Sequence, residues 1–552
     1  MIANITPLIR LPASTDVFDY FIPEELTDHI KPGQLVQIPF RTDKVPGVVL
    51  SLAATQASTK FRARPIDSVL ETNPILTPDQ LALTKVFSTY YFVTPGSVAR
   101  LMAPERPERT VRAKPTQFAD TRFAVSSEKI PLLKSTAEKI PSVRFAETQD
   151  VSSFVWTLLY LIKHSKQSQL LVLFPTIEMI SAIAGSVHKM CSDKLAIIHS
   201  GLGKSAYWHE YQKIISGSAR VILSTRQGVF LPIQRNSQII FFDSTSDDFK
   251  QYEQHPRYDA RIVGVWLAHA TKSKLIFISS SHILEAKKHD SLSIPAARNR
   301  SLTISLVDMQ NEMNQKDFSI IAERTLAAIN QAGEKKKKSV IIALREESEK
   351  GVSVKSLLEI LTPKLKNCNV SASTENFDVL VTTPRALEGL KLSSERQNLG
   401  LLIFASIEPM LAIPDYRSAE RSYYRLKHWQ MLAQELGFLR IILQSYSPES
   451  LAMRAFAYGE FELFNNQELA NRKELGYPPF SKLIKLSYRG KIASTAENLK
   501  KELAPRVTIS GPFTDSNGNA SLLLKVFNTI NLPEISKLGT DWIVDRDPEN
   551  VL

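Results

Sequence analysis

Two consecutive series of apolar segments constrain the fold more than any other feature of this sequence. The first series runs from 142 to 303 and includes QLLVLF at 169–174, and the second runs from 304 to 446 and includes SVIIAL at 339–344. A strand in which nearly every side chain is apolar must be covered on both faces, and helical segments separate these strands. Each series therefore predicts an α/β domain built on a parallel sheet.

The chain is too long for a single core, because cores stop growing near about 250–300 residues and this chain has 552. Residues 1–105 alternate short apolar runs such as LVQIPF (35–40) with turn residues, which predicts a small β-rich domain followed by a helix capped by Thr77. Residues 106–141 form a Pro- and Arg-rich linker, and 447–552 form a small α+β domain. We therefore expect a multidomain α/β protein.

Composition limits the classes of function. Lys and Arg exceed Asp and Glu by 68 − 56 = 12, so the chain is attracted to polyanions, with nucleic acid as the first candidate. No apolar run reaches the ~18–20 residues of a membrane span and no signal peptide is read, which predicts a cytoplasmic protein without a membrane partner. Cys191 and Cys368 are the only cysteines, which excludes a disulfide framework and a cysteine-rich zinc site. The lysine run at 335–338 is interpreted as a solvated loop rather than a DNA contact.

The N-terminal segment resembles a known family. VFDYFIPEEL…IKPGQLVQIPF (17–40) is similar to the DNA 3′-end-binding domain of the PriA family (primosomal protein N′), the bacterial replication-restart helicases. The resemblance implies a pocket in which a ring stacks on a base and a carboxylate accepts from a base amino group or a ribose hydroxyl. Its residues would be Phe18, Asp19, Arg41 and Arg64. Arg41 stands where the family usually has glycine and would either clamp a phosphate or block the pocket. In the alternative reading Phe18 and Tyr20 are core residues, and for Tyr20 that reading is favoured.

The two α/β series resemble the RecA-like lobes of the same helicases. In residues 142–303, lobe 1, DSTSDDFKQYEQHPRYDAR (243–261) is similar to a Walker B box joined to an aromatic-rich loop that couples DNA to ATP. Rings that stack on bases and cations that hold phosphates suit a DNA strand, although a polar surface loop is the alternative. The DNA-binding residues implied for lobe 1 are Arg226, Phe249, Lys250, Tyr252, Arg257 and Tyr258.

The resemblance continues to the end of the sequence. Lobe 2, residues 304–446, contains DYRSAER (415–421), a near-verbatim family string. The C-terminal domain, residues 447–552, contains NRKELGYPPFSKLIKLSYRG (471–490) and WIVDRDPENVL (542–552). The fold implied is a β-rich 3′-DNA-binding domain, two tandem RecA-like lobes and a small α+β C-terminal domain.

The segments that face ATP in the family have lost their chemistry. FAETQDVSSFVW (145–156), in the place of the P-loop, contains neither glycine nor lysine to hold phosphates. Asp243 remains as a residual nucleotide or Mg²⁺ position, but Ser244 and Thr245 replace the two acidic residues of the box, and the expected arginine pair is missing from 426–437. The cysteine-rich zinc-binding insertion and the winged-helix domain are also missing. We expect no catalytic residue, no zinc and no dependence on ATP or Mg²⁺.

The first hypothesis is a PriA-like protein of replication restart and repair that recognises forks, D-loops or 3′ strand ends without ATP hydrolysis. The second is an active ATP-dependent 3′→5′ DNA helicase with a divergent phosphate site, and the third is an interaction protein that no longer binds DNA. The resemblance implies branched or 3′-ended DNA, single-strand-binding protein and other restart proteins as partners, in the bacterial cytoplasm at the nucleoid. The sequence leaves open ATP binding without hydrolysis, oligomeric state and an active PriA in the same cell.

Overall fold

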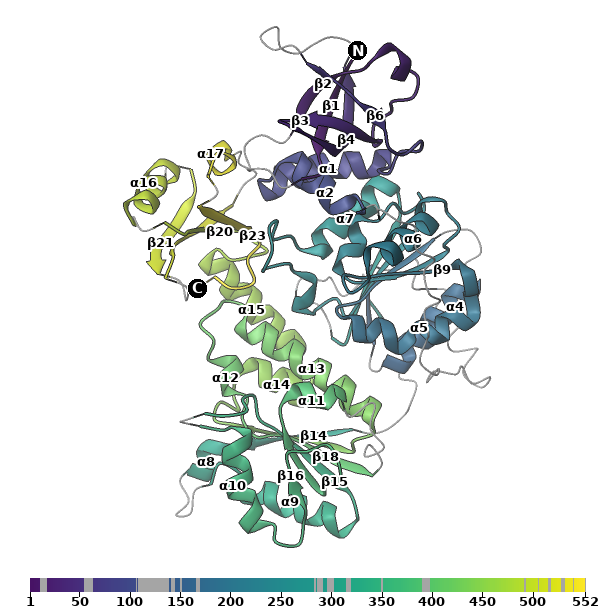
Figure 1. Cartoon of the computed structure of the whole chain (residues 1–552). Coiled ribbons are helices and arrows are strands. Elements are labelled where there is room, and N and C mark those ends of the chain that lie inside the picture. Colours follow the sequence, from purple (N-terminus) through teal and green to yellow (C-terminus); the bar gives the residue numbers. More distant parts are fainter. Residues whose placement is uncertain are drawn as a thin grey trace. The chain divides into compact units, whose positions relative to one another are not determined.

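The fold is taken from a computed structural model of the whole chain (Figure 1). The structure describes residues 1–9, 17–53, 63–105, 107, 139, 144–148, 151–164, 169–281, 284, 291–294, 302–313, 319–348, 351–389, 398–490, 493–504, 506–514, 518–527, 532–539 and 541–551. Most of the predicted linker, 106–141, lies outside these residues. No helix in the described part of the chain is long and apolar enough to span a membrane.

The chain packs into two compact units. Unit 1 comprises Met1–Ala146, Trp156–Ile278 and Gly476–Leu552, and unit 2 comprises Glu147–Val155 and Ser279–Leu475. Helices α14 (Leu451–Tyr458) and α15 (Phe461–Leu475) belong to unit 2, because Met453 and Phe464 are buried in its core. The predicted boundary at 446/447 therefore does not coincide with the change in packing, which occurs after Leu475.

The N-terminal part of unit 1 is a six-stranded sheet with the order β5-β2-β1-β4-β3-β6. Its strands are β1 (Ile2–Pro7), β2 (Phe18–Phe21), β3 (Leu35–Phe40), β4 (Asp43–Ala53), β5 (Arg64–Pro65) and β6 (Ser68–Val69). Ile5, Val36 and Val49 lie in its core. Helices α1 (Pro78–Tyr91) and α2 (Pro95–Met102) follow. The Thr77 hydroxyl accepts from the Gln80 amide, which confirms the predicted cap of α1.

The first α/β series forms a sheet with the order β13-β7-β12-β11-β8-β10-β9. Its strands are β7 (Phe145–Thr148), β8 (Leu170–Leu173), β9 (Leu195–Ile198), β10 (Val221–Ser224), β11 (Gln238–Phe242), β12 (Lys274–Ser279) and β13 (Ser291–Ile294). The helices are α4 (Val151–His164), α5 (Ile177–Cys191), α6 (Lys204–Ile215) and α7 (Ala260–Thr271). β11 pairs in parallel with both β8 and β12, and β10 pairs in parallel with β8 and β9. Parallel pairing explains why these strands are apolar on both faces.

The second series forms a sheet in unit 2 with the order β14-β19-β18-β15-β17-β16. Its strands are β14 (Thr303–Asp308), β15 (Lys338–Ile342), β16 (Val370–Ser371), β17 (Val379–Thr382), β18 (Leu399–Phe404) and β19 (Arg440–Ser445). All of these neighbours pair in parallel. Besides α14 and α15, the helices of this part of unit 2 are α8 (Met309–Met313), α9 (Glu323–Glu334), α10 (Val354–Lys364), α11 (Pro384–Gly389), α12 (Glu408–Leu411) and α13 (Ser418–Leu436).

The C-terminal part of unit 1 is a four-stranded antiparallel sheet with the order β21-β22-β20-β23. Its elements are β20 (Lys482–Tyr488), α16 (Ala493–Leu503), β21 (Thr508–Thr514), β22 (Ala520–Val526), α17 (Pro533–Ser536) and β23 (Trp542–Arg546). The predicted multidomain α/β class, with a β-rich beginning and an α+β end, is confirmed.

Candidate nucleic-acid interface

Phe18 and Asp19 lie on opposite faces of β2, because successive side chains of a strand alternate. The Phe18 ring packs on the core of the N-terminal sheet and meets the Phe40 ring edge-on, with 5.3 Å between the centroids. Asp19 faces the other way, where its Oδ1 accepts from Asn4 Nδ2 at 2.6 Å. The structure therefore does not bring this predicted pair together on one surface.

The other predicted pocket residues gather beside Phe18. Arg41 begins the two-residue turn between β3 and β4 with a φ of 54°, and its guanidinium carbon lies 5.8 Å from the centre of the Phe40 ring. Arg64 Nη1 donates to the Arg41 carbonyl at 3.0 Å. Two rings and two guanidinium groups are thus linked by successive contacts between β2, the turn after β3 and β5, a combination that suits a base and a phosphate.

Tyr20 is a core residue, as expected. Its side chain is 4% exposed, and its hydroxyl donates to the Pro39 carbonyl at 3.0 Å. Burial raises the pKa of this phenol above its ordinary value, and the positive charge of Arg64 opposes that shift. Tyr20 therefore fixes the strand that carries Phe18 rather than meeting a ligand.

The aromatic-rich loop is folded inward, which corrects the expectation for three of its residues. The Phe249 ring is fully buried and packs against Phe241 with 5.1 Å between centroids. Tyr258 is 5% exposed and packs edge-on against Phe230. Lys250 is also fully buried, so none of these three side chains presents a ring or a charge at the surface.

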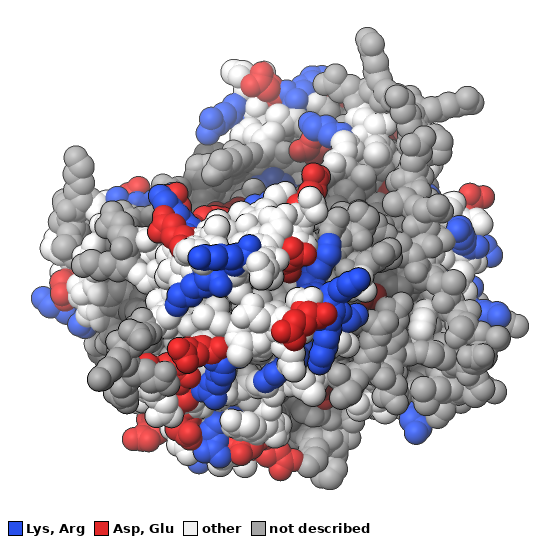
Figure 2. All heavy atoms as spheres, turned by 90° about the horizontal axis from the view of Figure 1, so that it is seen from below, with Lys and Arg blue, Asp and Glu red and all other residues white. Residues whose placement is uncertain are grey.

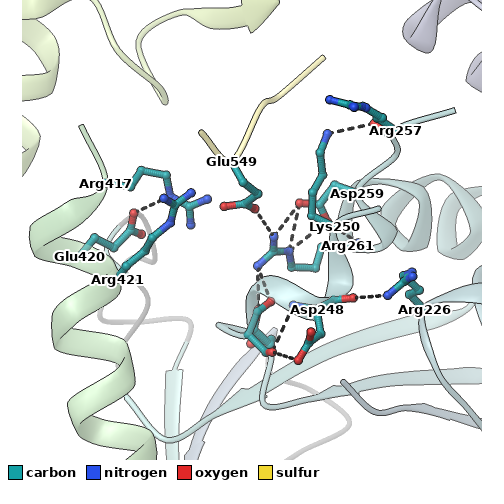
Figure 3. Close-up of polar contacts among 12 residues, drawn as sticks. Arg226, Asp248, Lys250, Arg257, Asp259, Arg261, Arg417, Glu420, Arg421 and Glu549 are labelled. Carbon is teal, nitrogen blue, oxygen red and sulfur yellow. Dashed lines mark hydrogen bonds and ion pairs between the residues drawn. The ribbon is translucent and has the colours of Figure 1, made fainter. Parts of the chain in front are cut away.

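Lys250 has specific partners in the C-terminal part of unit 1. Its ammonium donates to Asp545 Oδ1 at 2.9 Å and to the Arg546 carbonyl at 2.7 Å. It also donates to the Arg257 carbonyl at 2.9 Å (Figure 3). These acceptors use all three donors of the ammonium, so the buried charge is both paired and hydrogen-bonded. The loop and β23 are joined by this contact, which sequence reasoning missed. The signals available in the sequence were a lysine directly after Phe249 and an acidic residue within the strand WIVDR (542–546).

The remaining residues of the predicted set are more accessible. Tyr252 is 48% exposed. The Arg257 side chain is 27% exposed, and its Nη1 lies 3.4 Å from Asp545 Oδ2. Arg226 Nη1 donates to the Asp248 carbonyl at 3.2 Å (Figure 3). Tyr252 is therefore the aromatic residue of this loop with the geometry to stack on a base.

A second arginine holds the start of α7. Arg261 forms a 2.7 Å ion pair with Asp259, the N-cap residue of α7, and a 3.2 Å ion pair with Glu549 (Figure 3). It also donates to the Ser244 carbonyl at 3.2 Å. Arg261 thus fixes the loop after β11 to α7 and to the end of the chain, which is a structural role.

The segment in the place of a phosphate-binding loop is short. β7 ends at Thr148 and α4 begins at Val151. The Ser152 hydroxyl in the first turn of α4 donates to the Glu435 carboxylate of α13 at 2.9 and 3.1 Å, a contact within unit 2. A helix N-terminus favours an anion, and the carboxylate of the protein itself lies here.

Asp243 follows directly after β11 with a φ of 54° and is 5% exposed. The Thr245 hydroxyl lies 3.5 Å from Asp243 Oδ1. Near it, burial raises the pKa of Asp248 above its ordinary value, and a hydrogen bond from Ser246 opposes that shift. Within the described residues there is no group of three or more His, Cys, Asp and Glu side chains arranged to hold a metal ion.

DYRSAER (415–421) contributes a buried ion network to unit 2. The Glu420 carboxylate lies 2.9 Å from Arg417 Nε and 2.9 Å from Arg472 Nη2. Burial alone would raise the pKa of Glu420, but the two guanidinium groups outweigh it and lower the pKa to about 2. Since Arg472 is on α15, the network fastens α15 to α13.

Among the parts of this chain, the N-terminal region is the one that matches a protein-family model. Residues 8–104 match the family model of the PriA 3′ DNA-binding domain. Curated relatives are named replication restart protein PriA. The protein of Synechocystis sp. is 24% identical over 63% of this chain and 53% of its own length. That of Thermotoga maritima is 24% identical over 61% and 55%, and that of Helicobacter pylori is 22% identical over 90% and 89%. The chain thus spans about half the length of the first two relatives.

Similar solved structures are helicases. A DUF1998 helicase, MrfA, bound to DNA has a TM-score of 0.39 and 12% identity, covering 77% of this chain and 66% of its own. RecG bound to a three-way DNA junction has a TM-score of 0.36 and 12% identity, covering 71% of this chain and 51% of its own.

Proposed function

We propose that this chain, a divergent relative of the replication restart protein PriA, binds 3′ strand ends in branched DNA such as forks and D-loops, and does so without hydrolysing ATP. The observation that carries the proposal is the match of residues 8–104 to the 3′ DNA-binding domain, in which successive contacts link Phe18, Phe40, Arg41 and Arg64. The kinship also suggests single-strand-binding protein and other restart proteins as partners, at the bacterial nucleoid in the cytoplasm.

The chemistry of this edge suits the end of a strand. The half-buried Phe18 ring offers a face or edge to a terminal base, and stacking on an aromatic side chain is worth ~1–3 kcal/mol per base. Arg64 is exposed and is held next to Arg41, which is also exposed, so both guanidinium groups are available to phosphates near that base. Arg41 then acts as a phosphate clamp and not as a plug.

Asp19 lies apart from these four residues. Its carboxylate is oriented by Asn4, whose own side-chain oxygen accepts from Ser51 at 2.7 Å. This polar row lies on the face of the sheet opposite Phe18. A contact of Asp19 with DNA would therefore be made on that other face, independently of Phe18.

The absence of turnover is supported by the residues that would meet a nucleotide. A triphosphate needs a cradle of backbone amides and a lysine, and residues 145–156 contain neither glycine nor lysine. The Glu435 carboxylate accepts a hydrogen bond from Ser152 in the first turn of α4. These residues do not fit a nucleoside triphosphate, because phosphate oxygens there would meet a negative charge.

The test is a competition between forks with and without a 3′ end at the junction, using the full chain. We expect the fork with the 3′ end to bind more tightly, and Phe18→Ala with Arg64→Gln to reduce that preference toward unity. Lys31→Gln is the control, because Lys31 is an exposed lysine of the same domain that lies outside the cluster. Equal binding of the two forks by the unaltered protein would refute the proposal.

A second candidate is an active 3′→5′ helicase. The observation in its favour is Asp243, which keeps the position after β11 where an acidic residue of such a motor stands. ATP-dependent unwinding of a fork that disappears in Asp243→Ala would establish it.

A further inference from the structure

The amino-terminal edge of the second sheet carries a cluster of lysines. Because its strands are parallel, their amino ends meet at one edge. Lys335, Lys336 and Lys337 form the turn between α9 and β15, while Lys364 and Lys366 lie at the end of α10, just before β16. β17 alone separates β15 from β16, so the two strand starts are about 10 Å apart at ~4.8 Å per strand. We call these five side chains the lysine edge.

The two segments of the lysine edge are neighbours in the fold. Ala332 at the end of α9 and Leu365 at the end of α10 belong to one hydrophobic core cluster, and Cys368 packs against it. A Cβ added at Gly333 would lie 3.8 Å from Cys368 Sγ. The tertiary fold thus joins a four-lysine run to a second pair of lysines almost thirty residues away, a proximity the sequence alone does not reveal.

The two segments that form the lysine edge carry a net positive charge. In 334–338 and 364–378 the cations are the five lysines and Lys338, and the acids are Glu334, Glu375 and Asp378, so the net charge is 6 − 3 = +3. Asp378 already accepts from the Asn369 amide at 2.8 Å. No side chain of the lysine edge forms an ion pair with another residue in the part of the chain that the structure describes. Figure 2 views the face below α9 and β15, where Lys and Arg form groups with acidic side chains between them.

The absence of an accessible ring here distinguishes duplex DNA from a single strand. Single-strand sites combine cations with exposed aromatic platforms. The aromatic residue in these two segments is Phe377, which is 2% exposed and is covered by Lys338 Nζ at 4.9 Å from its ring centre. Flexible lysines without rings suit a regular row of phosphates, to which each contributes a point charge.

We propose that the lysine edge binds the phosphate backbone of a duplex arm of the branched DNA. The inference rests on the proposed function, since it takes DNA as the ligand, and adds a contact in unit 2 distinct from the proposed 3′-end site of the N-terminal sheet. Duplex DNA carries one charge per ~1.7 Å of axis, so an edge about 10 Å long faces several phosphates. Binding there is independent of sequence and sensitive to salt.

The test compares the salt dependence of binding to a blunt duplex for two patch variants of the full chain. Lys335→Gln with Lys336→Gln removes two charges from the turn, and Lys364→Gln with Lys366→Gln removes two from the end of α10. The logarithm of the binding constant falls linearly with the logarithm of the salt concentration, and each lost phosphate contact lowers the magnitude of that slope by about 0.9. Each variant should therefore lower it by about 1.8. That change corresponds to a roughly 12-fold smaller loss of affinity between about 50 and 200 mM salt.

The first sheet supplies a matched control. Lys272 and Lys274 are exposed, are separated by a single residue, and lie at the amino end of β12. Lys272→Gln with Lys274→Gln removes the same charge and should leave the slope unaltered. Lys335→Arg with Lys336→Arg should keep the slope of the unaltered protein, because a cation remains at each position.

The outcomes separate this inference from the proposed function. Reduced slopes in both patch variants, with the preference for a 3′ end retained, support the lysine edge. Slopes equal to those of the control overturn it, leaving the cluster to an acidic polypeptide or to solvent, while the 3′-end preference stands. Failure of the unaltered protein to bind any DNA overturns both.

Discussion

The ammonium group of Lys250 is fully buried and donates to the carboxylate of Asp545, 295 residues further along the chain. This contact unites the aromatic-rich loop with the last strand of the C-terminal sheet, inside unit 1. A buried charge whose partner is removed is strongly destabilising, because the remaining charge cannot be hydrated. The pair therefore acts on stability and positions the loop.

Lys250→Met should lower the free energy of unfolding by about 3–5 kcal/mol, since buried Asp545 would lose its 2.9 Å partner and keep only the 3.4 Å contact with Arg257. The double variant Lys250→Met with Asp545→Leu should lose less free energy of unfolding than the sum of the two single variants. The reason is that neither of the two buried charges remains in it. Urea unfolding of the four proteins measures this coupling. Full stability of Lys250→Met together with weakened DNA binding would return Lys250 to the DNA interface.

The two rings Phe249 and Tyr252 should respond differently to truncation. Phe249→Ala removes a fully buried ring and should destabilise the protein by about 3–5 kcal/mol. Tyr252→Ala should leave stability nearly unchanged and weaken DNA binding by up to ~1–3 kcal/mol if its exposed ring stacks on a base. Thermal unfolding and fork binding, measured on both variants, distinguish the roles. Loss of DNA affinity in neither variant would make this loop purely structural.

The Glu420 network predicts how unit 2 responds to acid. The folded pKa of Glu420 is lowered from 4.5 to about 2, so its contribution to stability is present above pH 4.5 and is lost as the pH falls toward 2. A shift of that size is on the order of 3 kcal/mol. The stability difference between the unaltered protein and Glu420→Gln should therefore shrink between pH 4.5 and 2. A difference that stays constant across this window would contradict the network.

Much of the fold could be predicted because local pattern and tertiary environment agree. Continuous apolar segments became buried parallel strands, and the Thr77 cap is determined by neighbours three residues apart. The resemblance implies one pocket for Phe18 and Asp19, although the alternation of a strand places them on opposite faces. The inward fold of Lys250 could not be predicted, because its partner Asp545 lies on a strand 295 residues further along the chain. Phe249 packs against Phe241 of the preceding strand, and that contact depends on how the loop turns back over β11.

The lysine run illustrates the same limit. By itself, 335–338 reads as a solvated turn. The second pair, Lys364 and Lys366, reaches the same edge only because α9 and α10 share a core. Charge clusters built from separate segments depend on the tertiary fold, so sequence patterns underestimate them.

ATP hydrolysis in the presence of forked DNA tests most directly the claim that this chain recognises DNA without turnover. The unaltered protein and Asp243→Ala should release phosphate at the same background rate while both retain their affinity for the fork. The reason is that residues 145–156 provide no lysine or glycine for phosphates, and Ser152 is hydrogen-bonded to Glu435. DNA-stimulated phosphate release that is abolished in Asp243→Ala would contradict the account.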